Sequence, residues 1–360
     1  MNQERINSHD LLTNYRSLLL FYIKNRYGRT RAKRHFEKKT GKQIGLWVME
    51  TALRSMRTLK KDKTYEELEY EDLEVLDILE HKKKIQRRKF SKQKKKHVVI
   101  LPPEPFAIWC IGDPHLDNDG CEILRLMKEM EIVKRNKNKI YSGCVGDLND
   151  NWIGRLGLLY QNTSITAEDG WKLSKWFLSQ MEWLFLLGGN HDAWANRAGI
   201  NPLQWLCQLS DVKVYGEDEV RIEIQWLGNS DLEEIRIQCR HDHKGRSWFH
   251  NTHGPNKAAI LDGKDHIFLS GHIHSWGHLQ TEQRYGRVTH AIRVKGYKQI
   301  DSYAKKNQFF TQEHGSSCLI VIDPMNKSPS RIQVFWDIET GAKYLDYLCS
   351  REDKTSDIDK

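Results

Sequence analysis

The chain has 360 residues, a hydrophobic fraction of 39% and 12 Trp, which allows one large folded domain plus a smaller one and excludes a wholly disordered protein. No run of about 18 apolar residues occurs, so we expect no membrane-spanning segment, and the polar start MNQERINSHD does not look like a secretion signal. The seven cysteines are scattered and never form a Cys-x-x-Cys pair, which favours reduced thiols and a cytoplasmic location.

The charge is distributed unevenly. Residues 1–97 carry 26 Lys and Arg against 13 Asp and Glu, whereas the remaining residues carry 31 against 35. A basic arm suits a polyanionic partner, and a mildly acidic body suits carboxylates arranged around divalent cations. This asymmetry predicts two regions with different tasks.

Three helices are predicted in residues 1–63. Apolar residues recur at helical spacing over 8–26, and further helices are expected over Thr30–Lys39 and Gln43–Arg57, with Gly41 as a stop signal between them. Three short helices with scattered Arg and Lys resemble a helix-turn-helix module that binds DNA. A small helical cap that packs on the rest of the protein is the alternative.

Residues 64–105 are predicted to form a charged helix or linker. The first part, 64–81, holds eight acidic residues and no basic ones, and 82–97 holds ten Lys or Arg and no acidic ones. This order favours the helix dipole. A solvated linker is the simpler interpretation, but the run is dense enough to contact phosphates. The candidate nucleic-acid-binding residues are Arg87, Arg88, Lys89, Lys94, Lys95 and Lys96. Pro102 and Pro103 then mark a domain boundary.

Residues 106–345 have the pattern of an α/β catalytic domain, followed by a polar tail over 346–360. Helices are expected over Glu122–Lys134 and Asp169–Gln180, between early strands, and the consecutive later strands indicate a second sheet. The predicted strands are Phe106–Ile111, Ile140–Val145, Trp183–Leu187, Val220–Trp226, Ile235–Cys239, His266–Ser270, Val288–Val294, Ser317–Ile322 and Ile332–Trp336.

Four polar motifs each follow a predicted strand, where α/β folds place ligands. They are Asp113-Pro114-His115, Gly146-Asp147, Gly189-Asn190-His191-Asp192 and Gly271-His272-Ile273-His274. Each motif alone could be a structural turn, but four in this order indicate one site. Asp, Asn and neutral His form a mixed oxygen and nitrogen ligand set that suits Mn²⁺, Fe, Zn²⁺ or Mg²⁺.

These motifs resemble those of the calcineurin-like metallophosphoesterase superfamily, which reads Asp-x-His, Gly-Asp-x-x-Asp, Gly-Asn-His-Asp/Glu, a lone His and Gly-His-x-His. The resemblance covers about residues 106–322 and implies a four-layer α/β/β/α sandwich with two divalent metal ions. We expect Mn²⁺, with Fe, Zn²⁺ or Mg²⁺ as alternatives. The resemblance also implies that Asp113, His115 and His274 hold the first metal and that Asp147 bridges both. The second metal would be held by Asn190, His272 and the lone His.

The lone His is ambiguous in the sequence. Strand alternation places Ile235, Ile237, Cys239 and His241 on one face, so that His241 emerges at the strand end. His253 is the alternative, because it precedes a short helix and then the Gly-His-x-His strand. We favour His241.

The ligand set implies two-metal hydrolysis of a phosphoester by a metal-bridging hydroxide. Such an attack needs a proton donor on the far side of the phosphorus, and His191, oriented by Asp192, is the candidate. Asn149, Asp150 and Asn151 are candidates for contacts that support the ligands. Nearby aromatic residues could stack on bases or simply pack in the core, and these are Trp152, Tyr160, Trp194 and Trp248.

The substrate is predicted to be a phosphodiester of DNA. Phosphoprotein phosphatases of the superfamily continue the second motif with Arg-Gly, where this chain has Asn151-Trp152, so the resemblance favours an SbcD-like or phage-encoded nuclease. The alternatives are a phosphomonoesterase acting on small molecules or proteins, and a non-catalytic DNA-binding protein on the same fold. DNA is the expected partner, no membrane is expected, and a homo-oligomer or an ATPase partner stays open.

Overall fold

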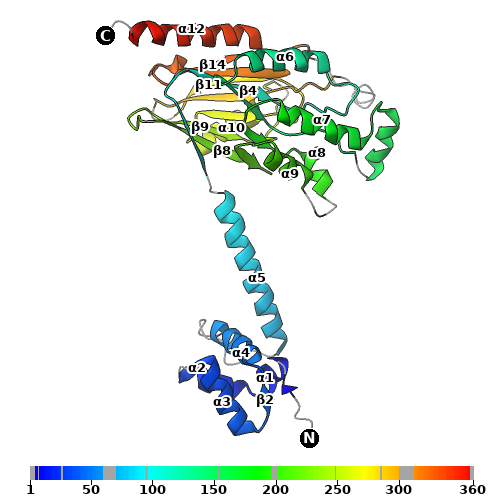
Figure 1. Cartoon of the computed structure of the whole chain (residues 1–360), viewed down its shortest axis with the longest axis vertical. Coiled ribbons are helices and arrows are strands. Elements are labelled where there is room, and N and C mark those ends of the chain that lie inside the picture. The colour runs from blue at the N-terminus through cyan, green and yellow to red at the C-terminus, as the bar shows by residue number, and fades with distance from the viewer. Residues whose placement is uncertain are drawn as a thin grey trace. The chain divides into compact units, whose positions relative to one another are not determined.

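The structure is a computed structural model that describes the chain except residues 1–4, 7, 26, 60–69, 94–95, 153, 197–198, 200, 248, 284–285, 300–311 and 357–360. It divides into two compact units, which we call the N-terminal unit (residues 1–93) and the second unit (residues 94–360) (Figure 1). Among the described residues, no helix is both long and apolar enough to span a membrane.

The N-terminal unit contains four short helices around a small apolar core. The helices are α1 (Ser8–Asn14), α2 (Arg16–Lys24), α3 (Arg29–Thr40) and α4 (Leu46–Leu59), and β1 (Arg5–Ile6) pairs in parallel with β2 (Gln43–Ile44). The single helix predicted over 8–26 is therefore two helices, which are separated at Tyr15. As predicted, α3 ends at Gly41, whose φ of 68° is left-handed. The core is made of fully buried residues, among them Leu11, Leu19, Tyr22, Phe36 and Met49.

Residues 70–93 of the charged segment form one helix, α5 (Tyr70–Gln93), which agrees with the predicted helix and not with the simpler interpretation as a linker. Its described side chains, those of residues 75–87, are mostly exposed. The predicted linker over 64–105 is wrong at its end, because His97–Leu101 is strand β3 of the second unit and pairs with β8. The sequence did not predict this strand, because a half-buried strand normally alternates apolar and polar residues. Here the exposed positions are occupied by the apolar residues Val98 and Ile100.

Two six-stranded mixed sheets form the centre of the second unit. Their orders are β11-β12-β10-β9-β8-β3 and β14-β13-β4-β5-β6-β7. The strands of the first sheet beside β3 are β8 (Val220–Trp226), β9 (Ile235–Cys239), β10 (Ile267–Ser270), β11 (Gly277–Glu282) and β12 (Val288–Arg293). Those of the second sheet are β4 (Phe106–Ile111), β5 (Ile140–Cys144), β6 (Trp183–Leu187), β7 (Val214–Gly216), β13 (Ser317–Ile322) and β14 (Ile332–Phe335).

Helices cover both outer faces of the paired sheets (Figure 1). One apolar core lies between the sheets, and a second lies between the β4-containing sheet and the helices α6 (Ile123–Arg135), α7 (Ala167–Ser179), α9 (Pro202–Leu209) and α12 (Ile338–Ser356). Helix α10 (His253–Asp262) contacts β10 and β12 of the other sheet. The unit is therefore a four-layer α/β/β/α sandwich, which confirms the expected fold class.

The consecutive later strands form most of a second sheet, as predicted, since β8 to β12 lie in one sheet with β3. Two details of the later part of the chain differ from the expectation. Strands β13 and β14 belong to the sheet of the early strands, because β13 returns to pair with β4. The segment 346–360 is not simply a polar tail, because α12 extends to Ser356 and buries Leu348 against the second core. Both features depend on contacts between residues more than 200 positions apart in the sequence, which local periodicity does not report.

Candidate metal centre

The strand ends bring the four motifs together. Strands β4, β5 and β6 are parallel, so the residues after them leave the same edge of their sheet. Strands β9 and β10 are parallel in the opposing sheet and end beside that edge. Hydrogen bonds join the loops, since Asp113 N donates to Gly146 O and His272 N donates to the Asp113 carboxylate, at 3.1 and 2.7 Å. The site therefore spans both sheets.

The backbone at these positions adopts a conformation that most residues avoid. Asp113, His115, Asp147, His272 and His274 all have left-handed φ values, between 43° and 69°. Such residues cost about 1–3 kcal/mol each and persist only where the surroundings impose them, most often at functional sites. Five ligand candidates share this conformation, which is independent evidence that the loops direct these side chains towards one site.

Two glycines allow the loops to approach closely. A Cβ at Gly189 would lie 2.0 Å from Asp147 Oδ1, and a Cβ at Gly271 would lie 2.4 Å from Asp113 Oδ2. Any side chain at either position would displace a central carboxylate. The glycines of the motifs thus leave room for the carboxylates of the site, in addition to allowing the backbone to turn.

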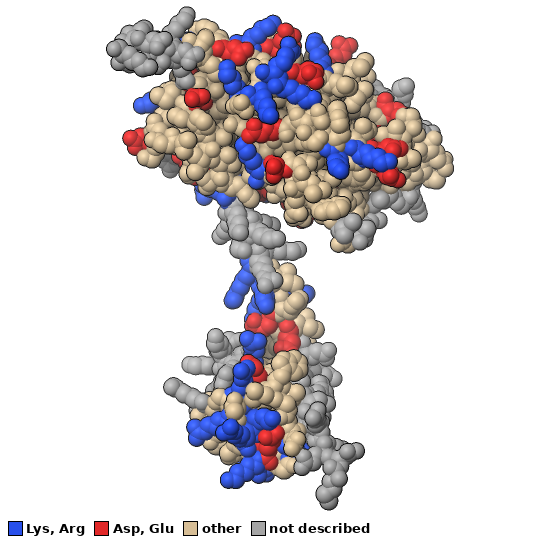
Figure 2. Space-filling view, viewed as in Figure 1, with Lys and Arg blue, Asp and Glu red and all other residues tan. Residues whose placement is uncertain are grey.

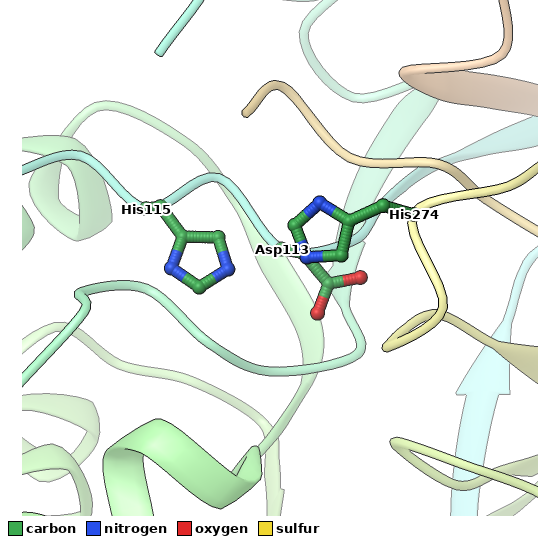
Figure 3. Close-up of side chains that lie close together, drawn as sticks. All are labelled: Asp113, His115 and His274. Atoms are coloured by element: carbon green, nitrogen blue, oxygen red, sulfur yellow. The ribbon is translucent and has the colours of Figure 1, made fainter. Parts of the chain in front are cut away.

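The first ligand group consists of Asp113, His115 and His274 (Figure 3). Their ligand atoms lie within 4.8 Å of one another. His115 Nδ1 lies 2.7 Å from Asp150 Oδ1, an arrangement that leaves Nε2 available for a cation. Among the described residues, neither His115 Nε2 nor Asp113 Oδ1 has a hydrogen-bond partner, although both atoms are buried. Buried polar atoms without partners are costly, and a bound cation would satisfy both of them.

The second ligand group consists of Asp147, His241 and His272, with Asn190 beside it. His241 Nδ1 lies 2.8 Å from Val145 O, so a proton on Nδ1 leaves Nε2 as the ligand. That Nε2 lies 3.1 Å from Asp147 Oδ2, 2.9 Å from Asn190 Oδ1 and 3.2 Å from His272 Nδ1. His241 Nε2 and the three atoms near it therefore form a cluster of four potential ligand atoms.

The structure places His241, and not His253, in this cluster. His253 is the first residue of α10 and is exposed. His241 follows β9, whose residues Ile235, Ile237 and Cys239 face the core between the sheets, as strand alternation predicted.

The charges of the second group require a positive partner. Burial lowers the pKa of His241, but the carboxylates of Asp147 and Asp113 raise it more strongly, to about 10. Burial raises the pKa of Asp147, but attraction to His241 lowers it well below its ordinary value. The carboxylates thus draw a proton onto His241 at neutral pH. A divalent cation would supply that positive charge and release the proton, as metal binding to histidine generally does.

The remaining ligand candidates also suit a cation. Burial, together with the neighbouring His115, lowers the pKa of His274 to about 3, so this ring is neutral and can act as a ligand at neutral pH. With oxygen donors from Asp and Asn and nitrogen donors from His, the two groups fit a pair of divalent transition-metal ions.

The expected pairing of His191 with Asp192 is wrong. The Asp192 carboxylate accepts hydrogen bonds from the backbone N–H groups of Asp147 and Gly189, at 2.7 and 2.9 Å. His191 Nδ1 instead lies 2.5 Å from the backbone carbonyl of Asp150. Asp192 lies at the third position of α8 (Asn190–Ala195), where its side chain reaches back to the backbone before the helix. It therefore positions the Asp147 loop, and the Asp150 carbonyl orients His191.

Sequence reasoning missed Arg293, a fully buried arginine at the end of β12. Its Nη1 donates to Gly271 O at 2.6 Å, its Nε donates to Asn251 O at 2.8 Å, and both Nη atoms lie 3.3 Å from Asp242 Oδ1. Gly271 precedes His272 and Asp242 follows His241, so one guanidinium holds both histidines of the second group through their neighbours. A lone Arg at a strand end carries no sequence signal for this role.

Aromatic residues and one lysine adjoin His191. The His191 ring lies 5.1 Å from that of Trp152 and 4.2 Å from that of Trp194, and Lys298 Nζ lies 4.9 Å from the Trp152 ring centre. Lys298 also donates to Asp150 Oδ1 at 3.0 Å. Trp152, Tyr160 and Trp194 are half-buried, and Trp248 lies outside the described residues.

The basic run is only partly described. Arg87 is exposed on α5, and Lys96 Nζ lies 2.9 Å from Glu223 Oε2 of β8. The side chains of Arg88 and Lys89, and all of Lys94 and Lys95, lie outside the described residues. The nucleic-acid role of the six residues stays a prediction.

No family model and no curated protein matches the chain. Among solved structures, it is similar to the NAD nucleotidase NadN of Haemophilus influenzae, with 10% identity and a TM-score of 0.33 over 64% of this chain and 49% of that one. The chain thus spans about half the length of NadN. It is also similar to the calcineurin-like phosphoesterase YfkN from Bacillus subtilis, with 9% identity and a TM-score of 0.34 over 69% of this chain and 97% of that one. Both likenesses are distant, and neither identifies the reaction of this chain.

Proposed function

We propose that the chain is a metal-dependent phosphoesterase. One observation carries the proposal: two adjacent groups, Asp113/His115/His274 and Asp147/His241/His272, place ligand atoms within 4.8 Å of one another in each group. The groups are in contact, because Asp113 Oδ1 lies 3.7 Å from His241 Nδ1. A pair of divalent sites that share a carboxylate-rich centre is typical of phosphoester hydrolysis.

Asp113, His115 and His274 would hold one cation, and His241, His272 and Asn190 the other, with Asp147 between them. When bound, two divalent cations supply an activated water near neutral pH and offset the negative charge of the phosphoryl oxygens. The mixed oxygen and nitrogen donors suit Mn²⁺, Fe, Zn²⁺ or Mg²⁺, and we propose Mn²⁺ as the cation in the protein.

The chain's own residues orient these ligands. Asp150 lies against His115 Nδ1 and accepts from Lys298, so its carboxylate fixes the His115 ring. Asp192 holds the backbone N–H of Asp147 in the same way. Burial lowers the pKa of His191 to about 4, so its ring is neutral before substrate binds. The negative charge of a bound phosphate would favour the protonated ring, which could then donate a proton to the leaving oxygen.

Phosphodiesters of DNA are the proposed substrates. The basic composition of residues 1–97 supports a polyanionic substrate, because DNA carries one negative charge per 1.7 Å of helix axis. Asn151, which occupies the place where the resembling phosphoprotein phosphatases have Arg, is 7% exposed and uncharged. A phosphomonoester of a small molecule or protein is the second candidate, and a non-catalytic DNA-binding protein is the third.

The test compares hydrolysis of bis-p-nitrophenyl phosphate with that of p-nitrophenyl phosphate by the full chain in Mn²⁺, with Asp147→Asn as the matched inactive control. We expect the diester to be the better substrate and a plasmid or duplex oligonucleotide to be cleaved. Preference for the monoester without DNA cleavage would exclude the nuclease. Inactivity on every ester, with metal and DNA binding intact, would support the third candidate.

A further inference from the structure

Helix α3 of the N-terminal unit carries a concentrated positive charge. Its twelve residues, RTRAKRHFEKKT, contain six Lys or Arg and one Glu. Figure 2 shows Lys and Arg side chains gathered on the N-terminal unit over the region where Figure 1 draws α2 and α3. The basic surface is thus on a folded element and is separate from the basic run in the second half of α5.

Three of these cations form one outward stripe. Arg31, Arg34 and Lys38 recur at helical spacing on the side opposite the fully buried Ala32 and Phe36. All three are exposed, and they lie within about 10 Å of helix length. Among the described side chains, no carboxylate forms an ion pair with any of the three. Lys33 and Arg29 differ, because they pair with Glu37 and Glu50.

The helix presents these charges from a fixed position. Phe36 packs against Tyr15, with ring centres 5.0 Å apart, and Ala32 lies in the same apolar cluster. Arg31 stacks over the Tyr27 ring at 4.3 Å, which limits its side-chain freedom. A helix held by its core, with exposed cations along one face that have no carboxylate partner among the described side chains, suits a row of phosphates.

We propose that the Arg31–Arg34–Lys38 stripe is the surface through which the N-terminal unit binds the sugar-phosphate backbone of duplex DNA. The proposal rests on the proposed function only in naming DNA as the partner, since binding by this surface needs no hydrolysis. A helix face that offers three cations and an apolar reverse side fits contacts to phosphates, which position a protein without reading sequence. The basic half of α5 then serves mainly as a solvated connection, in which Lys83 already lies 3.5 Å from Glu80.

The experiment uses the full chain and two triple variants with equal loss of charge. The first is Arg31→Gln, Arg34→Gln and Lys38→Gln, and the matched control is Lys82→Gln, Lys83→Gln and Lys84→Gln, all exposed on α5. Binding of a fluorescent 30-base-pair duplex is measured between 50 and 300 mM salt. We expect the α3 variant to bind DNA at least about tenfold more weakly. The slope of log affinity against log salt concentration should become less negative by about 2–3. Both changes should be smaller in the α5 variant.

Several results would overturn the proposal. They are an unchanged affinity in the α3 variant, a larger loss in the α5 variant, or equal binding of the native chain to vesicles with an anionic lipid surface. Circular dichroism and thermal unfolding check that the α3 variant folds. As a further control, the single variant Arg34→Lys, which keeps the charge, should bind DNA more tightly than the single variant Arg34→Gln. Hydrolysis of bis-p-nitrophenyl phosphate, which needs only the second unit's site, should be unchanged in both variants. Loss of DNA binding with that activity intact therefore separates the stripe from the proposed catalytic function.

Discussion

The N-terminal unit and the second unit place their charges in opposite ways. In the N-terminal unit, the core is apolar and the cations of α3 lie on the surface. In the second unit, Asp113, Asp147, Asp150 and Asp192 are at most 3% exposed. Surface cations are screened by salt and can attract an anionic partner. Buried carboxylates are unfavourable unless positive groups compensate their charge. The contrast supports both proposals, a docking surface in the N-terminal unit and a cation-binding centre in the second unit.

The largest difference between the two units is expected for the substitution Asp147→Asn in the second unit. The amide keeps the shape but removes the charge that attracts His241, so we expect the hydrolysis rate to fall by about 1000-fold or more. The diester assay measures this. DNA binding at 100 mM salt is the control, because we propose that it depends on the N-terminal unit. Substantial residual turnover would show that the two ligand groups do not act as one site.

His191→Ala tests the chain's own contribution beside the metals. Because proton donation by a positioned side chain contributes about 100- to 10,000-fold, we expect a loss in that range with nearly unchanged Mn²⁺ stoichiometry. Metal content is measured on the same preparation by elemental analysis. Loss of both metals in this variant would contradict the assigned role and make His191 a ligand.

Arg293→Met tests whether the buried guanidinium positions the second ligand group. We expect about 10- to 100-fold weaker Mn²⁺ affinity at the Asp147/His241/His272 group and a smaller change at the other group. Calorimetric titration resolves the two affinities, and Arg293→Lys, which keeps the charge but not the planar fork, is the matched variant. Equal weakening at both groups would mean that Arg293 supports the fold in general.

The smallest expected effect concerns acid stability of the second unit. Burial lowers the pKa of His266 to about 4 and that of His290 to about 3, against an ordinary value near 6.5. The folded state therefore favours the neutral rings, and their stabilising contribution is complete above pH 6.5 and declines as the pH falls towards 4.

Trp fluorescence can follow this unfolding, because Trp47 is the one tryptophan in residues 1–93 and the other eleven lie in the second unit. His290→Gln should flatten the decline of stability between pH 6.5 and 4. A variant with the same pH dependence as the native chain would exclude His290 as a source of acid sensitivity.

Much of the second unit could be predicted from short segments. Strands such as Phe106–Ile111 and Trp183–Leu187 begin and end at the predicted residues, because buried strands are continuous apolar runs with polar motifs directly after them. Strand β3 and helix α12 were not predicted. Val98 and Ile100 on β3 are exposed, and the buried Leu345 and Leu348 of α12 are interspersed with charged residues.

The sequence by itself determined which residue types could bind cations and that each follows a strand, because both facts are local. Only the tertiary structure decided between His241 and His253 as the ligand. It also showed that Asp192 accepts from the Asp147 backbone instead of orienting His191, and that Arg293 contacts the loop of the second ligand group. These outcomes depend on contacts between strands of two different sheets, whose register no local pattern records. The outward position of the cations on α3 also depends on tertiary packing, because it is set when Ala32 and Phe36 pack in the core of the N-terminal unit.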